Sequence, residues 1–184
     1  MTVPEGWDAA AALAARPEAA WDGRLWRMHK RRYPADDPGG ARLVSGRYNR
    51  GLDRFGEGEV FTALYLATAP EVCLGEIYRH TTPELLPFLN GFRLSELSAS
   101  LGRVADCRDP GRLGLAPGGL SHDTDYRATQ ALGAAANRGG LEGILVPSAT
   151  GLGDNLILFP QNLLAGSRLE VVSVRDPRLY VERD

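Results

Sequence analysis

The chain has 184 residues, of which 43% are hydrophobic, and its formal net charge is −2 with a pI of about 5.9. This length and composition suit one folded domain and exclude a disordered chain. A protein that coats nucleic acid is usually basic, so we expect no direct nucleic-acid partner. No segment approaches the roughly 20 apolar residues of a membrane helix, so we expect no membrane partner either.

The two cysteines, Cys73 and Cys107, have no metal-ligand neighbours at short spacing. Two cysteines cannot build a dense disulfide framework, so the sequence favours a reducing, cytoplasmic setting. Residues 1–16 lack the basic start and apolar run of a signal peptide, which agrees with that location.

The first half of the chain predicts two helices and two strands. Residues 8–15 are rich in alanine and predict a short helix. Residues 24–29 alternate polar and apolar side chains, which predicts a strand, and prolines and glycines make 30–46 a loop. Residues 60–67 predict a buried strand, and 69–80 have the apolar spacing of a helix.

The second half predicts one helix, residues 125–137, which paired glycines end. Five segments predict strands: 92–97, 103–107, 143–146, 155–159 and 169–174. Many short strands with a few helices indicate an α+β domain with short mixed or antiparallel sheets. We expect residues 1–23 to be an N-terminal helical extension and 24–184 to be the main domain.

Glu76 is the strongest single indication of a site. It lies four residues after Val72 and three after Cys73, which places its carboxylate on the inward stripe of the predicted helix. Such a carboxylate is costly unless it is paired or functional. The sequence leaves open an ion pair with an arginine or a carboxylate in a cleft.

Two arginines are candidates for binding an anion. Arg47 follows Gly46, which lets the backbone approach a ligand closely, and a guanidinium binds phosphate through two parallel hydrogen bonds. Arg27 alternates with Trp26 and Met28 on a predicted strand and points either into a cleft or into solvent. Taken alone, both arginines also suit an exposed surface.

Ser148 directly follows a predicted strand, where functional residues often lie. It has no nucleophile-elbow motif, and His29, His80 and His122 are scattered without metal-ligand spacing. We therefore expect neither a serine hydrolase nor a metal site. Residues 151–155 share glycines with a dinucleotide motif, but a predicted strand follows them, which excludes a Rossmann fold.

Taken in order, these motifs resemble the RES domain family over about residues 24–175. The matching stretches are 25–27, 45–49, 64–67, 74–76, 106–109, 125–130, 142–148 and 155–159. Tyr48 and Thr150 depart from the pattern, because many members have tryptophan or phenylalanine at the first position and arginine at the second.

The resemblance implies a fold like that of ADP-ribosyltransferases and a toxin that degrades NAD⁺ or transfers ADP-ribose. By the same resemblance, the catalytic residues are Arg47, Glu76 and Ser148. The implied NAD⁺-binding residues are Arg27, Arg47, Tyr48, Tyr65, Ser148 and Asn155. NAD⁺ is then a substrate, and no cofactor is expected.

The resemblance also implies a partner, an antitoxin that carries a DNA-binding domain. The leading hypothesis is cleavage of NAD⁺ by a glycohydrolase or phosphorylase. The alternatives are a protein ADP-ribosyltransferase and a catalytically silent module that binds a nucleotide or an antitoxin. The acceptor and the oligomeric state, including a homo-oligomer, stay open.

The implied chemistry agrees with the residue types. Breaking the bond between nicotinamide and ribose builds positive charge on the sugar, which a carboxylate such as Glu76 stabilises. Arginines suit the pyrophosphate of NAD⁺. We expect Tyr65 to stack on nicotinamide or to bind ribose, and Ser148 to hold a ribose hydroxyl or a phosphate.

Overall fold

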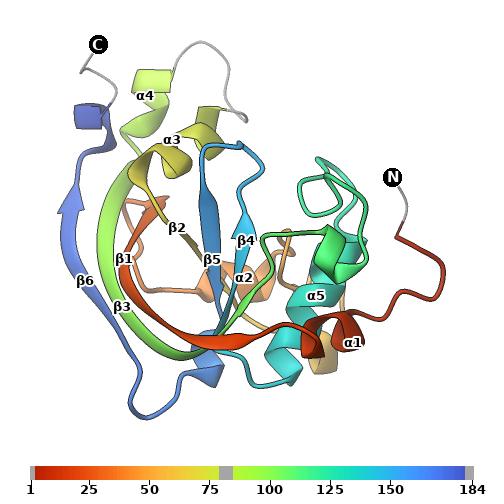
Figure 1. The fold of residues 1–184 in the computed structure, drawn as a ribbon. Helices are drawn as coiled ribbons and strands as arrows, with labels where there is room; N and C mark the ends of the chain where they lie inside the picture. The colour runs from red at the N-terminus through yellow and green to blue at the C-terminus, as the bar shows by residue number, and fades with distance from the viewer. Residues whose placement is uncertain (1–2, 79–84, 181–184) are drawn as a thin grey trace.

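A strongly curved sheet organises the protein (Figure 1). The structure is a computed structural model that describes residues 3–78 and 85–180. Six strands make up the sheet in this part of the chain: β1 (Glu18–Lys30), β2 (Leu64–Ala67), β3 (Phe92–Asp106), β4 (Gly143–Pro147), β5 (Asp154–Leu158) and β6 (Arg168–Arg175).

The strands lie in the order β1-β2-β5-β4-β3-β6, and β1 also pairs with β3. The strands β1, β2, β5, β4 and β3 therefore form a closed ring of pairings, with β6 outside it. β3 and β4 run parallel, whereas the other pairs are antiparallel, so the sheet is mixed. The long strand β3 joins the two parts, because β6 pairs with its first half and β4 with its last residues.

The described helices are α1 (Ala9–Ala14), α2 (Gly39–Leu43), α3 (Pro70–Tyr78), α4 (Leu85–Leu89) and α5 (Arg127–Arg138). The Asp8 carboxylate caps α1 by accepting a 2.8 Å hydrogen bond from the Ala10 N–H, one of the free donors at a helix start. Figure 1 shows α1 and α5 side by side on one side of the sheet and α3 near one end of it.

Two of the three hydrophobic clusters in the described residues lie on the two faces of the ring. Leu66 and Leu156 point into the ring, together with Leu25 and Leu97. The other core lies between the sheet and α5 and includes Ile157. Because side chains alternate along a strand, the neighbours of the inward leucines on β2 and β5 face outward, toward α5. This outward face carries the residues that line the candidate site.

The α+β prediction is confirmed, but one predicted break between strands is wrong. The expected division between residues 23 and 24 falls inside β1, which begins at Glu18, and Leu13 of α1 is buried in the same core as α5. The predicted strands 92–97 and 103–107 are one strand, β3, because residues 98–101 between them continue the ladder with β1.

Other differences are smaller. The predicted loop 30–46 contains α2, the predicted strand 60–67 begins only at Leu64, and α3 starts one residue later than expected. His80, the expected last residue of that helix, lies outside the described residues. The remaining predicted strands and the helix 125–137 shift by one or two residues at their ends. Within the described chain, no helix is long and apolar enough to span a membrane.

Candidate functional site

A cleft of about 350 Å³ opens on the outward face of β2 and β5. Its walls come from loops, strands and α3, which are far apart in the sequence. The lining residues are Met28, Arg47, Tyr48, Tyr65, Ala67, Cys73, Glu76, Ile77, Phe92, Tyr126, Pro147, Ala149, Asn155 and Ile157.

Glu76 is the carboxylate that lines this cleft. One turn earlier on α3, Val72 and Cys73 are buried, so the helix is anchored and Glu76 is presented at the edge of the core. The Glu76 carboxylate accepts a 2.7 Å hydrogen bond from the Ser148 hydroxyl and a 3.3 Å hydrogen bond from the Asn155 amide. These two neutral donors orient the carboxylate and leave its negative charge in the cleft.

Ser148 lies behind Glu76 and does not line the cleft. Its side chain is only 4% exposed, and its oxygen accepts a 3.1 Å hydrogen bond from the Thr150 N–H. The hydroxyls of Ser148 and Thr150 are also 2.8 Å apart. Thr150, one of the two departures from the family pattern, therefore helps to hold the serine that contacts Glu76.

Arg47 also lines the cleft. One guanidinium nitrogen donates to the carbonyls of His122 and Leu120, and the group stacks on the Tyr126 ring at 4.8 Å from its centroid. These partners are carbonyls and a ring, so no carboxylate among them neutralises the guanidinium. The arginine can therefore offer its positive charge to an anion in the cleft.

Tyr65 and Tyr48 also line the cleft. The Tyr65 hydroxyl accepts a 2.8 Å hydrogen bond from the Tyr48 N–H and donates a 2.9 Å hydrogen bond to the Asn49 side-chain oxygen. Burial raises the pKa of both tyrosines, so both phenols are neutral at physiological pH. The Tyr65 ring faces the cleft, but its hydroxyl is already engaged by the protein.

The structure does not place Arg27 with the other predicted site residues. Met28 lines the cleft, and neighbouring residues on a strand point to opposite faces, so Arg27 faces away from it. The Arg27 guanidinium donates to the carbonyls of Ala35 and Asp37, and burial lowers its pKa. These hydrogen bonds show that Arg27 holds the loop that follows β1.

Several lining residues were missed by the sequence analysis. Met28 and Phe92 come from β1 and β3, and Ile77 from α3, and together they add apolar surface near Glu76. Tyr126 was part of a matching stretch but received no role. Burial raises the pKa of the Cys73 thiol to about 12, so this cleft residue is a protonated thiol and a poor nucleophile at neutral pH.

The cleft lining therefore contains a cation, Arg47, and a carboxylate, Glu76, together with apolar surface. It is complementary to an extended ligand that carries a negative group near Arg47 and develops positive charge near Glu76. Within the described residues, no group of three or more His, Cys, Asp or Glu side chains is placed to hold a metal ion.

Known proteins were compared with this chain. It is similar to one chain of the crystal structure of the M. tuberculosis MbcT–MbcA toxin–antitoxin complex, with 26% identity over 95% of both chains and a TM-score of 0.77. No curated protein sequence matches. The sequence pattern of the RES domain matches residues 24–182, which is nearly the whole chain. The chain therefore belongs to the RES domain family.

Proposed function

We propose that this protein cleaves the bond between nicotinamide and ribose in NAD⁺, and that it acts as the toxin of a toxin–antitoxin pair. One observation carries the proposal: the Glu76 carboxylate and the Arg47 guanidinium line the same cleft, together with apolar side chains. NAD⁺ has the matching order of groups, because a pyrophosphate lies at one side of its nicotinamide ribose and an aromatic ring at the other.

In the proposed complex, the anomeric carbon of the ribose lies over Glu76. The carbon–nitrogen bond breaks with both electrons passing to the nicotinamide nitrogen, which was cationic and becomes neutral. The positive charge that develops on the ribose is stabilised by the Glu76 carboxylate, held ready by Ser148 and Asn155. Water or phosphate then bonds to the anomeric carbon, and water releases one proton to the solvent.

Arg47 binds the pyrophosphate in this proposal. Its position on the Tyr126 ring fixes the plane of the guanidinium, which favours two parallel hydrogen bonds to phosphate oxygens. Met28, Ile77 and Phe92 offer apolar surface to the nicotinamide ring. The protein contributes binding, orientation and charge, and it needs no cofactor for this reaction.

The proposed partner is an antitoxin with a DNA-binding domain. Support comes from the similar crystal structure, which is that of a toxin–antitoxin complex. An enzyme that drains NAD⁺ must be restrained in its own cell, and a partner segment that enters the cleft and offers a carboxylate to Arg47 would block the substrate. Expression of the chain alone should lower cellular NAD⁺ and arrest growth, and co-expression of the antitoxin should restore both.

The direct test is NAD⁺ consumption by the purified chain, with and without phosphate and with candidate acceptor proteins. Free nicotinamide with ADP-ribose indicates hydrolysis, and a phosphorylated ADP-ribose indicates phosphorolysis. Labelled protein indicates ADP-ribosyl transfer. Soluble, folded protein that leaves NAD⁺ intact under all three conditions overturns the proposal and favours a silent binding module.

A further inference from the structure

A single buried asparagine organises the loop that carries Arg47. Asn49 is 1% exposed, and its amide donates to the carbonyls of Ala41 and Val44 at 2.6 and 3.0 Å. Its side-chain oxygen accepts from the Gly46 N–H at 3.0 Å and from the Tyr65 hydroxyl at 2.9 Å. Both donors and both acceptor positions of the Asn49 side chain are therefore used.

These bonds hold the peptides on either side of Arg47. Before Arg47, the Gly46 N–H donates a hydrogen bond to the Asn49 side-chain oxygen. The Gly46 carbonyl accepts a 2.9 Å hydrogen bond from the Gln130 side-chain amide of α5. After Arg47, the Tyr48 N–H donates to the Tyr65 hydroxyl, which in turn donates to Asn49. The backbone of Arg47 is thus fixed from both neighbours, while its side chain projects into the cleft.

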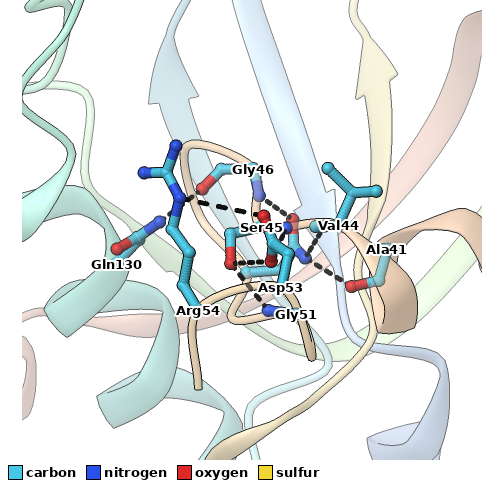
Figure 2. A network of polar contacts seen from close by, with 9 residues as sticks. Ala41, Val44, Ser45, Gly46, Gly51, Asp53, Arg54 and Gln130 are labelled. Carbon is cyan, nitrogen blue, oxygen red and sulfur yellow. Dashed lines mark hydrogen bonds and ion pairs between the residues drawn. The ribbon is translucent and has the colours of Figure 1, made fainter.

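Gly46 is needed for this arrangement. A side-chain carbon at Gly46 would lie 2.5 Å from both the Asn49 oxygen and the Tyr65 hydroxyl. The glycine that the sequence analysis connected with close approach to a ligand therefore makes room for the protein's own network. Figure 2 shows Gln130 beside Gly46 and Ala41 and Val44 on the opposite side of the same loop.

A second set of contacts closes the base of the loop. The Asp53 carboxylate accepts from the Ser45 N–H at 2.8 Å and from the Ser45 hydroxyl at 2.6 Å (Figure 2). The Ser45 hydroxyl also accepts a 3.0 Å hydrogen bond from the Gly51 N–H. The two hydrogen bonds to Asp53 are exposed to solvent, whereas Asn49 is buried, so Asn49 is the main connection between the loop and the sheet.

We infer that Asn49 is a positioning residue for Arg47, acting through Tyr65 and the Gly46 and Tyr48 peptides. This inference rests on the proposed function, because it assigns Arg47 the task of binding the NAD⁺ pyrophosphate. A guanidinium needs a fixed plane to make two parallel hydrogen bonds to a phosphate. Asn49 fixes the backbone of the Arg47 loop without contacting the ligand. The Tyr65 hydroxyl connects Asn49 to the Tyr48 N–H and is not assigned a contact with the substrate.

The test is a double-mutant cycle that measures the dissociation constant for ADP-ribose, a probe that carries the pyrophosphate. Wild type, Asn49→Ala, Arg47→Ala and the double variant are compared. We expect Asn49→Ala to weaken binding about tenfold in the wild-type background and less than about twofold when Arg47 is already absent. In steady-state assays with NAD⁺, Asn49→Ala should raise KM more than it lowers kcat.

Asn162→Ala is the matched control. The Asn162 amide also donates to two backbone carbonyls, those of Asn137 and Leu141, each at 2.8 Å, but it lies outside the cleft lining. It should lower the melting temperature without changing ADP-ribose binding. Tyr65→Phe is the second variant if Asn49→Ala does not fold, because it keeps the ring in the cleft and removes only the hydroxyl.

The outcomes separate this inference from the proposed function. An equal loss of affinity with and without Arg47, or no loss at all, overturns the positioning role. If the wild type neither binds ADP-ribose nor consumes NAD⁺, the proposed function fails, and amide hydrogen exchange then decides the positioning role alone. Faster exchange at the Gly46 and Tyr48 N–H groups in Asn49→Ala supports it, and unchanged exchange overturns it.

Discussion

Among the residues that line the cleft, Glu76 is carried by regular secondary structure, whereas Arg47 is carried by a loop. Glu76 stands on α3 above a packed core, and its partner Asn155 belongs to β5. Arg47 has loop residues before and after it, and its side chain contacts a second loop at His122. Packing thus fixes the backbone that carries Glu76, while hydrogen bonds fix the backbone that carries Arg47.

This difference has a consequence for function. A carboxylate that stabilises charge in a transition state must be in place before the reaction, and a helix on a hydrophobic core provides that rigidity. A binding arginine can tolerate more adjustment, and loops held by polar contacts open locally at lower free energy than packed elements. We therefore expect changes around Glu76 to lower kcat and changes around Arg47 to raise KM.

The largest expected effect comes from Glu76→Gln. This change keeps the size of the side chain and removes the charge, so kcat for NAD⁺ should fall by about 10²–10³ while KM changes little. The hydrogen bond from Ser148 can still form, so the melting temperature should stay close to that of the wild type. Near-native turnover by the folded variant would place the chemistry at another residue.

Arg47→Ala should raise KM by about 10- to 100-fold, because charge-assisted hydrogen bonds to the pyrophosphate are lost. Arg47→Lys should recover only part of this loss, since a lysine offers a point charge instead of a planar group. Steady-state kinetics with NAD⁺ measure both. A large fall in kcat with unchanged KM would contradict the proposed division of roles, in which Glu76 serves the reaction and Arg47 serves binding.

The contact between α5 and the Arg47 loop can be disturbed by one methyl group. A side-chain carbon at Gly133 would lie 2.0 Å from the Tyr48 carbonyl oxygen, so Gly133→Ala must displace the loop or the helix. We expect the free energy of unfolding to fall by about 1–3 kcal/mol, with KM raised more than kcat is lowered. Gly58→Ala is the control, because its added carbon meets no atom within 4 Å.

The same contrast explains what the sequence could and could not predict. The helical spacing of Val72, Cys73 and Glu76 depends on local geometry alone, so the sequence placed Glu76 on the inward side of α3. The surroundings of Arg47 depend on Asn49, which no periodic pattern distinguishes from an ordinary loop asparagine. Three of its hydrogen bonds are to residues 41–46 of the same segment, and the fourth, from the Tyr65 hydroxyl, forms only when the loop meets β2 in the folded protein.

Arg27 illustrates another limit. Strand alternation correctly implied that Arg27 and Met28 point to opposite faces, but the sequence does not say which face carries the cleft. That choice depends on how the sheet closes into a ring, through the long-range pairing of β1 with β2 and β3. The orientation of a strand residue is therefore predictable relative to its neighbours, and its function is not.

The smallest effect on activity is expected at Glu142, which is fully buried and lies outside the cleft lining. Its carboxylate accepts from the backbone N–H groups of Gly102, Arg103 and Leu164 at 2.6, 2.8 and 3.1 Å. Burial raises the pKa of Glu142, but the hydrogen bonds from Ser167 and these backbone groups outweigh it and lower the pKa below its usual 4.5.

A carboxylate whose pKa is lower in the folded state stabilises the protein above its ordinary pKa, and this stability is lost as the pH falls through the folded-state value. Denaturant unfolding between neutral pH and about pH 3 should therefore show falling stability below about 4.5, with a smaller slope in Glu142→Gln. The variant should be less stable at neutral pH, because an amide places its own donors among backbone donors. Its kcat and KM at neutral pH should equal those of the wild type, and a change in either would mean that this part of the sheet is coupled to the cleft.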